Sequence, residues 1–324
     1  MKANATYSFV LSVPSGAVVS FASKEAGSAV APQLVVTYKQ AAVATTRFGA
    51  AFNPHSATRL EQLAGEWGGM QVTRSYDGGS GVKPFLNTYQ PMDVAHNAAS
   101  AYSFKYSPSE VTAGTHDAEV RSFFQGIADN HPVYWTYWHE PDDEIFKNHT
   151  FTATAYRDAW AHLRAIHDSV KQARGAAMQT FATFICMEYS MRPNIAPSRP
   201  LTGSNGMYPG DAVIDVFGVD SYNAAAPGGV TDAATQFGKV IDFAQQHGKP
   251  WAIGELGSID VTGTANGRAT YLKNAISYWK SRGSEPAYVA YFDLVYGGND
   301  YTFDDDAAAT KVWHDAVTLG YSAF

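Results

Sequence analysis

The chain has 324 residues, of which 45% are apolar, so it can bury a core of the size found in one large domain. Its formal net charge of −7 is spread without long runs of one sign, which argues against nucleic acid or an anionic membrane as a partner. No apolar run reaches the roughly 18 residues that a membrane span needs. A single cysteine, Cys186, excludes an internal disulfide bond.

The region up to Tyr38 contains three short runs in which apolar and polar residues alternate, TYSFVLSV, AVVSFASKE and PQLVVTY. Turn-forming residues separate them, so each run predicts a β-strand. Three strands bury too little surface for an independent sandwich. The stretch FASKEAGSAVAPQLVVTY resembles the last strands of a carbohydrate-binding β-sandwich module. This resemblance implies that residues 1–40 are the tail of such a module, truncated at its start and without a signal peptide, and that residues 41–324 form a second domain.

From Arg47 onward, short apolar runs alternate with segments of helical periodicity. Eight runs predict strands: RFGAAF, GMQVTRSY, AYSFKY, PVYWTYWHE, AMQTFATFIC, DVFGVDSY, PWAIGELG and AYVAYFD. The clearest helix, residues 152–174, has apolar residues on one face, and two others, 232–248 and 268–283, end at glycines. Alternation of eight strands with helices predicts an α/β fold, the (β/α)8 or TIM barrel, preceded by a short N-terminal β segment. An open, doubly wound sheet is the alternative.

Motifs for cofactors are missing from this pattern. Neither of the glycine-rich sequences that bind nucleotide phosphates follows the first strand. The acidic stretch HEPDDE lacks the second histidine of a zinc motif, and NDYTFDDD lacks the glycine and spacing of a calcium loop. Residues 304–306 are instead expected to cap the last helix. We therefore expect no cofactor and no metal, with a metal-dependent hydrolase as the weaker alternative.

Two glutamates end strand-like runs, where (β/α)8 barrels place their active sites. Glu140 ends the fourth run and Glu255 lies at the end of the seventh, and these two strand ends can face each other across the barrel mouth. Strand alternation predicts that Glu140 shares a face with Trp138. By the same rule Glu255 shares a face with Trp251 and Ile253. Because an unpartnered buried carboxylate is unfavourable, the pair indicates a functional site.

Four segments, RFGAAF, His139-Glu140, VFGVDSY and KPWAIGELGS, occur in this order along the second domain. Together they resemble the clan A glycoside hydrolases. The histidine before Glu140 resembles family 26 in particular, which has histidine at this position, whereas most of the clan has asparagine. The resemblance implies a secreted enzyme whose acid/base glutamate ends strand four and whose nucleophile ends strand seven. The loop PDDEIFKNH lacks the tryptophans of the mannanases. The expected substrate is therefore not mannan alone but β-mannan or β-glucan.

The chemistry that this resemblance implies is an endo-type cleavage by double displacement. Glu140 would protonate the leaving oxygen, and Glu255 would attack the anomeric carbon. Retaining enzymes hold such carboxyl groups roughly 5–5.5 Å apart. Burial beside Trp135 and Trp138, together with nearby negative charge, is expected to raise the pKa of Glu140. By strand alternation, Trp135 and Tyr137 would face the helices.

Five further residues are expected to bind substrate or orient the pair: His139, Arg74, Trp138, Tyr222 and Asp220. Arg74 would lie beneath Glu255, and Tyr222 would donate a hydrogen bond to it. His139 would bind a substrate hydroxyl or Glu140 itself. The acidic residues 142–144 are expected in a solvated loop. The expected partner is a polysaccharide or oligosaccharide, bound by a monomer, and a barrel that binds sugar without cleaving it is the other alternative.

Overall fold

The computed structural model describes residues 18–21, 34–37, 46–77, 81–223, 230–260 and 265–324. The chain divides into two compact units, residues 1–45 and 46–324, which are described separately. In the first unit, β1 (Val18–Phe21) pairs antiparallel with β2 (Leu34–Thr37). These strands fall within two of the three predicted runs. The first predicted run lies outside the described residues.

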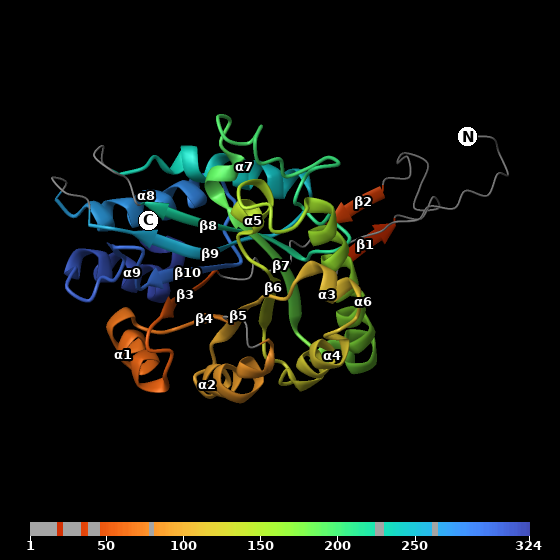
Figure 1. The fold of residues 1–324 in the computed structure, drawn as a ribbon. Helices are drawn as coiled ribbons and strands as arrows, with labels where there is room; N and C mark the ends of the chain where they lie inside the picture. The colour runs from red at the N-terminus through yellow and green to blue at the C-terminus, as the bar shows by residue number, and fades with distance from the viewer. Residues whose placement is uncertain (1–17, 22–33, 38–45, 78–80, 224–229, 261–264) are drawn as a thin grey trace, which may run out of the picture. The chain divides into compact units, whose positions relative to one another are not determined.

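The second unit contains a closed barrel of eight parallel strands in the order β10-β3-β4-β5-β6-β7-β8-β9 (Figure 1). Its strands are β3 (Arg47–Phe52), β4 (Val72–Tyr76), β5 (Ala99–Phe104), β6 (Val133–Tyr137), β7 (Thr180–Met187), β8 (Val216–Asn223), β9 (Trp251–Ser258) and β10 (Tyr288–Asp293). Each lies within or overlaps one of the eight predicted runs. The closure through β10 and β3 confirms the (β/α)8 barrel and excludes the open sheet.

Helices follow the strands around the outside of the barrel. The helices are α1 (Ala57–Trp67), α2 (Gln90–Ala95), α3 (Pro108–Thr112), α4 (Asp117–Gly126), α5 (Pro141–Phe146), α6 (Ala153–Arg174), α7 (Ala233–Gln246), α8 (Gly267–Ser281) and α9 (Ala307–Leu319). Single turns of other helix types are η1 (Phe85–Tyr89), η2 (Gly175–Ala177), η3 (Glu188–Met191) and η4 (Gly320–Ala323). A two-stranded hairpin follows β10, formed by β11 (Val295–Tyr296) and β12 (Asn299–Asp300). Among the described helices, none is long and apolar enough to cross a membrane.

Side chains cap the first turns of several helices. Thr152 accepts a hydrogen bond from the backbone N–H of Ala155 at the start of α6, and Asp232 does the same for α7. Such caps satisfy N–H groups that the first turn leaves without a helical partner. Of the three acids expected to cap the last helix, Asp306 caps α9, whereas Asp304 forms an ion pair with Arg59.

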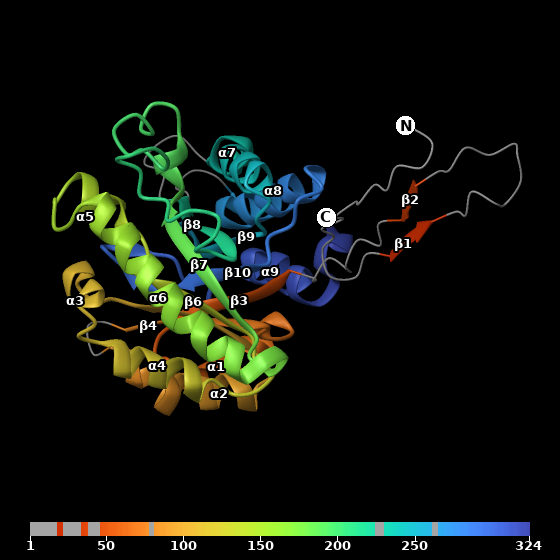
Figure 2. The ribbon, with the colours of Figure 1, turned by 90° about the vertical axis from the view of Figure 1, so that its right-hand side faces the viewer.

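The core has two apolar layers separated by the barrel wall. The larger layer lies between strands and helices, where Trp135 of β6 packs on Trp160 of α6 with ring centroids 5.2 Å apart. Figure 2 shows α6 running along the outside of β6 and β7. Trp135 and Tyr137 belong to this layer, which confirms that they face the helices. The smaller layer fills the barrel interior with residues such as Val72 and Tyr288.

Nearer the carboxyl ends of the strands, the buried side chains become polar and charged. Arg74, Thr136 and Asp220 are each fully buried, and Glu255 is 4% exposed. Buried charges are tolerated only when other charges or hydrogen bonds compensate them. The mouth of the barrel therefore holds a cluster of buried charges of both signs, and packing of the apolar core does not explain it.

Candidate active site

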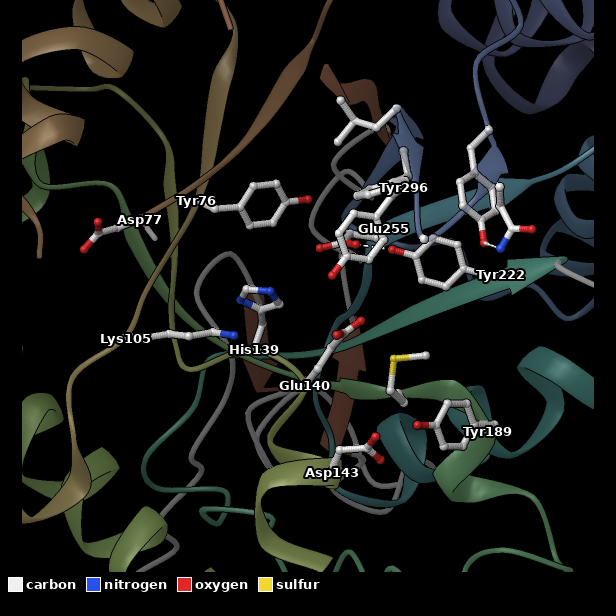
Figure 3. A pocket seen from close by; sticks show the side chains of 16 residues that line it. Tyr76, Asp77, Lys105, His139, Glu140, Asp143, Tyr189, Tyr222, Glu255 and Tyr296 are labelled. Carbon is white, nitrogen blue, oxygen red and sulfur yellow. Dashed lines mark hydrogen bonds between the residues drawn. The ribbon is translucent and has the colours of Figure 1, made fainter. Parts of the chain in front are cut away.

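A cavity of about 890 Å³ opens at the carboxyl ends of the barrel strands. Figure 3 shows its side chains converging from several strand ends. The lining residues are Tyr76, Asp77, Lys105, His139, Glu140, Asp143, Met187, Tyr189, Tyr222, Glu255, Phe292, Leu294, Tyr296, Gly297, Asn299 and Tyr301. Of the seven residues predicted for the site, Glu140, Glu255, His139 and Tyr222 line this cavity.

Glu140 enters the cavity from a turn and not from a strand. Strand β6 ends at Tyr137, so the expectation that it continues to Glu140 is wrong, and so is strand alternation at Trp138. Trp138 has a φ of 46° and Glu140 a φ of 52°, in the left-handed region. Each such residue costs about 1–3 kcal/mol and persists only where its surroundings hold it. Backbone hydrogen bonds to Phe104 and Ile185, of 2.9 and 3.0 Å, hold these two residues.

Glu255 faces the cavity because of an irregularity in β9. The register between β8 and β9 shifts, so that Val219 pairs with Ile253 but Asp220 pairs with Glu255. Ile253 packs in the outer layer, as Trp251 does, so the prediction that they share a face with Glu255 is wrong. A bulge adds one residue and reverses the alternation beyond it.

Gly254 provides the extra residue at this bulge. A Cβ at this position would come within 2.5 Å of Oδ1 of Asp220 and within 2.8 Å of Cδ1 of Ile185. No side chain fits in this space, which explains the glycine. Glu255 therefore points toward the mouth for two reasons. It lies near the end of β9, and the bulge at Gly254 turns its side chain to the cavity.

Three side chains surround the carboxylate of Glu255. Nη2 of Arg74 lies 3.8 Å from Oε1, and the hydroxyl of Tyr222 donates a hydrogen bond to Oε2. The hydroxyl of Tyr76 points toward the same carboxylate (Figure 3). Arg74 is itself held by a 2.6 Å hydrogen bond to Ser103. This arrangement stabilises a negative charge on Glu255, and it places Arg74 and Tyr222 where the sequence predicted.

Three carboxyl groups meet at the base of the cavity. One oxygen each of Glu140, Asp220 and Glu255 lie within 4.8 Å of one another. Burial, and then the negative charges of Glu255 and Asp142, raise the pKa of Glu140 to about 8. Burial also raises the pKa of Asp220 well above its ordinary value, and Glu255 and Glu140 add to the effect. A pKa of about 8 keeps Glu140 protonated at neutral pH, and Arg74 places a positive charge next to Glu255.

The three oxygens also form a candidate site for a hard divalent cation, since Mg²⁺ and Ca²⁺ prefer carboxylate ligands. Arg74 already supplies one positive charge next to Glu255. A cation in this position would compete with Arg74 and with the proton that the raised pKa keeps on Glu140. The residues therefore fit a shared-proton cluster better than a metal centre.

His139 and Trp138 differ in how they relate to the cavity. His139 lines it, and burial lowers the pKa of its imidazole well below the ordinary value, with Arg74 and Lys105 acting in the same direction. Its Nδ1 has no hydrogen-bond partner within the described part of the chain. This nitrogen is itself buried, so a ligand in the cavity would meet other atoms of the ring.

Trp138 lines a separate cavity of about 470 Å³ that shares Lys105 with the first. Its indole packs against Phe151, with ring centroids 4.7 Å apart, and the amine of Lys105 lies 5.6 Å from its centroid. The tryptophan environment expected around Glu140 is therefore wrong, because Trp135 faces the helices. The raised pKa of Glu140 is confirmed, and its causes are burial and the negative charges of Glu255 and Asp142.

The expectation of a solvated loop at residues 142–144 is also wrong. These residues form the first turn of α5, and Asp142 is 1% exposed. Its Oδ2 accepts a 3.0 Å hydrogen bond from the backbone N–H of Met187 at the end of β7. Asp143 forms an ion pair with Arg199. Asp142 thus ties the turn that carries Glu140 to the neighbouring strand.

Several lining residues were not predicted from the sequence. Tyr76, Lys105 and Tyr189 lie at or just beyond the ends of β4, β5 and β7, and Phe292 lies near the end of β10. The rule that residues at strand ends line the mouth of a (β/α)8 barrel would have found these four. The hairpin residues Leu294 to Tyr301 follow β10 and carry no such signal.

The barrel has the fold of known glycoside hydrolases. The catalytic domain of a family 26 endo-β-1,4-mannanase from Bacillus sp. JAMB-750 matches with a TM-score of 0.58 and 14% identity over 86% of each chain. A family 26 β-mannanase from Bacteroides ovatus, BoMan26A, matches with a TM-score of 0.55 and 12% identity over 86% of this chain and 90% of that chain.

Cel5A of Thermotoga maritima, solved in complex with mannotriose, gives a TM-score of 0.53 and 10% identity over 84% of this chain and 98% of that chain. No family model and no curated protein sequence matches the chain. Identities this low show a shared fold. They give no support to the resemblance of residues 1–40 to a carbohydrate-binding module.

Proposed function

We propose that the protein is a retaining glycoside hydrolase that cleaves a β-linked polysaccharide with Glu140 and Glu255. The observation that carries this proposal is the approach of their carboxylate oxygens to within 4.8 Å in one cavity. Inverting enzymes separate their carboxyl groups by roughly 6.5–9.5 Å to leave room for water, whereas retaining enzymes use about 5–5.5 Å. The approach of single carboxylate oxygens to within 4.8 Å fits the closer of these two arrangements and supports direct attack by one of the pair.

The two environments support the assignment of roles. Glu255, next to Arg74 and hydrogen-bonded by Tyr222, is the nucleophile that attacks the anomeric carbon. Glu140, whose raised pKa keeps it protonated at neutral pH, donates its proton to the leaving oxygen. The bond from the anomeric carbon to Glu255 forms as the glycosidic bond breaks. Water, deprotonated by Glu140, then releases the sugar and restores both groups.

The remaining cavity residues support a substrate with many hydroxyl groups. The imidazole of His139 and the amine of Lys105 both line the cavity, and Lys105 can donate hydrogen bonds to such hydroxyl groups. The cavity adjoins two others, of about 470 Å³ through Lys105 and about 410 Å³ through Tyr189, Tyr222 and Tyr301. A cleft that continues on both sides of the glutamates fits internal cleavage of a chain. β-Mannan or β-glucan is the proposed substrate, and a polymer of this size is degraded outside the cell.

Activity is expected to decline above about pH 8, because the raised pKa of Glu140 sets the pH at which the proton donor is lost. On the basic side, kcat/KM on polysaccharide should fall about tenfold per pH unit. Glu140→Gln removes the titrating group, so its residual kcat/KM on the same polysaccharide should lose this decline. A basic limb that persists unchanged in the variant would assign it to another group.

The direct test is release of reducing ends from mannan, mixed-linkage glucan, cellulose, xylan and alginate, with sizing of the products. We expect one β-linked polymer to give oligosaccharides of intermediate length. Addition of EDTA should leave the rate unchanged, and a loss restored by Mg²⁺ or Ca²⁺ would favour a metal-dependent hydrolase at the carboxylate cluster. Binding to a polymer without release of ends would favour the non-catalytic barrel.

A further inference from the structure

The two sides of the cavity differ in chemistry. Figure 3 shows Asp77, Lys105 and His139 on one side of the glutamates and Tyr222 on the other. On the side of Tyr222 the side chains are mostly aromatic. A sugar ring has the same division, with C–H groups on its faces and hydroxyl groups at its edges. The cavity is thus built to receive rings whose faces lie against one wall.

Four rings form what we call the aromatic wall: Tyr222, Phe292, Tyr301 and Tyr296. Tyr222, which is bonded to Glu255, lies 5.5 Å from Phe292 and 5.2 Å from Tyr301 between ring centroids. Phe292 in turn lies 6.2 Å from Tyr296. The wall therefore runs without interruption from the carboxylate to the hairpin of β11 and β12.

The outer end of this wall is exposed. Tyr296 is 72% exposed and its neighbour Val295 is 68% exposed. A single exposed apolar residue is ordinary. Of the four large apolar side chains that are exposed in the described part of the chain, however, two are adjacent at this hairpin, and Tyr296 also lines the cavity.

The base of the hairpin is fixed. Arg268, 4% exposed, donates a hydrogen bond to the carbonyl oxygen of Asp300. The hydroxyl of Tyr291 donates a hydrogen bond to the carbonyl oxygen of Tyr301. The turn consists of Gly297 and Gly298 with φ of 59° and 82°, the left-handed values that tight hairpins require. Tyr296 is thus presented on a supported strand and loses little freedom when a ligand covers it.

We propose that Tyr296 is an outer stacking platform for a neutral β-linked polysaccharide, binding the face of a sugar ring beyond the ring that reacts. The inference rests on the proposed function of the cavity. An aromatic face attracts the C–H groups of a sugar and releases water from both surfaces. Only a chain long enough to extend from Glu255 along the aromatic wall reaches this platform, so the platform selects polymer over short glycosides.

The test compares Tyr296→Thr and Tyr296→Phe, since threonine keeps the strand preference but has no ring and phenylalanine keeps the ring. The substrates are the soluble polymer that the wild-type protein degrades and an aryl monoglycoside of the same sugar, which has no ring beyond the one that reacts. In Tyr296→Thr, KM for the polymer should rise about five- to tenfold with kcat nearly unchanged, because the lost contact is made equally before and during reaction. Kinetics on the aryl monoglycoside should not change, and Tyr296→Phe should behave as wild type.

Leu319→Thr is the matched control, since Leu319 is also an exposed apolar residue, 58% exposed, but lies on α9 and does not line the cavity. An unchanged polymer KM in Tyr296→Thr overturns the inference. Equal losses on both substrates also overturn it, because they place the effect on the glutamates. If the wild type cleaves no polymer, the proposed function fails. The platform is then tested by electrophoresis in gels that contain mannan or mixed-linkage glucan. Retardation of the wild type that is lost in Tyr296→Thr supports the platform, and equal mobility of the wild type and Tyr296→Thr rejects it.

Discussion

Glu255→Ala is expected to lower kcat on polysaccharide by at least about four orders of magnitude, because no other group can form the bond to the anomeric carbon. Added azide should restore part of the turnover of an aryl β-glycoside with a good leaving group. Azide fits the space left by the carboxylate and attacks from that side. The product should therefore be a glycosyl azide of inverted configuration, which NMR spectroscopy identifies.

This substitution also removes the ion-pair partner of Arg74, whose Nη2 lies 3.8 Å from Oε1 of Glu255. Leaving a buried charge unpaired typically costs about 3–5 kcal/mol of stability. Asp293→Asn is the matched control, because Asp293 is 2% exposed, pairs with Arg59 at 2.8 Å and does not line the cavity. Because Arg59 keeps Asp304 as a second partner, this variant should lose less stability, and it should retain kcat at temperatures below its unfolding transition. Loss of kcat in both folded variants would place the effect on the fold.

Glu140→Ala is expected to act through the leaving group. On polysaccharide, whose leaving oxygen needs a proton, kcat/KM should fall about 10²- to 10⁴-fold, the usual contribution of general acid catalysis. A dinitrophenyl glycoside, which leaves without protonation, should keep a nearly normal rate of the first step and show a burst. The second step becomes slow because no base activates water, so the glycosyl-enzyme accumulates on Glu255.

Azide again distinguishes the two roles. In Glu140→Ala it replaces the activated water and should yield a glycosyl azide of retained configuration. Glu140→Gln is the control for folding, since it keeps the size of the side chain in a turn whose backbone has a φ of 52° at this residue. An azide product of inverted configuration from the Glu140 variant, or a retained one from the Glu255 variant, would exchange the two assignments.

Tertiary contacts explain why parts of the site could not be predicted. At Glu140 the apolar run PVYWTYWHE looks continuous, yet β6 ends at Tyr137. Trp138 and Glu140 take left-handed φ values, and backbone bonds to Phe104 and Ile185 on neighbouring strands hold them there. At Asp142 the local sequence is acidic and predicts solvent. The residue is buried because the amide of Met187, distant in the chain, needs an acceptor. In both cases the hydrogen-bond partner lies on another strand, distant in the chain. The local sequence around Glu140 or Asp142 therefore cannot predict these conformations.

The sequence by itself determined the barrel fold and the location of the two glutamates at the strand ends. Alternating apolar runs and amphipathic helices specify parallel strands buried on both faces, and the parallel arrangement brings the carboxyl ends of β6 and β9 to one mouth. Only the tertiary structure decided how the side chains point there. The left-handed turn at Glu140, the bulge at Gly254 and the packing of Asp220 beneath them set the carboxylate separation, the raised pKa of Glu140 and the neighbours of Glu255. Distances, burial and charge coupling of this kind arise between strands, and a linear pattern carries no record of them.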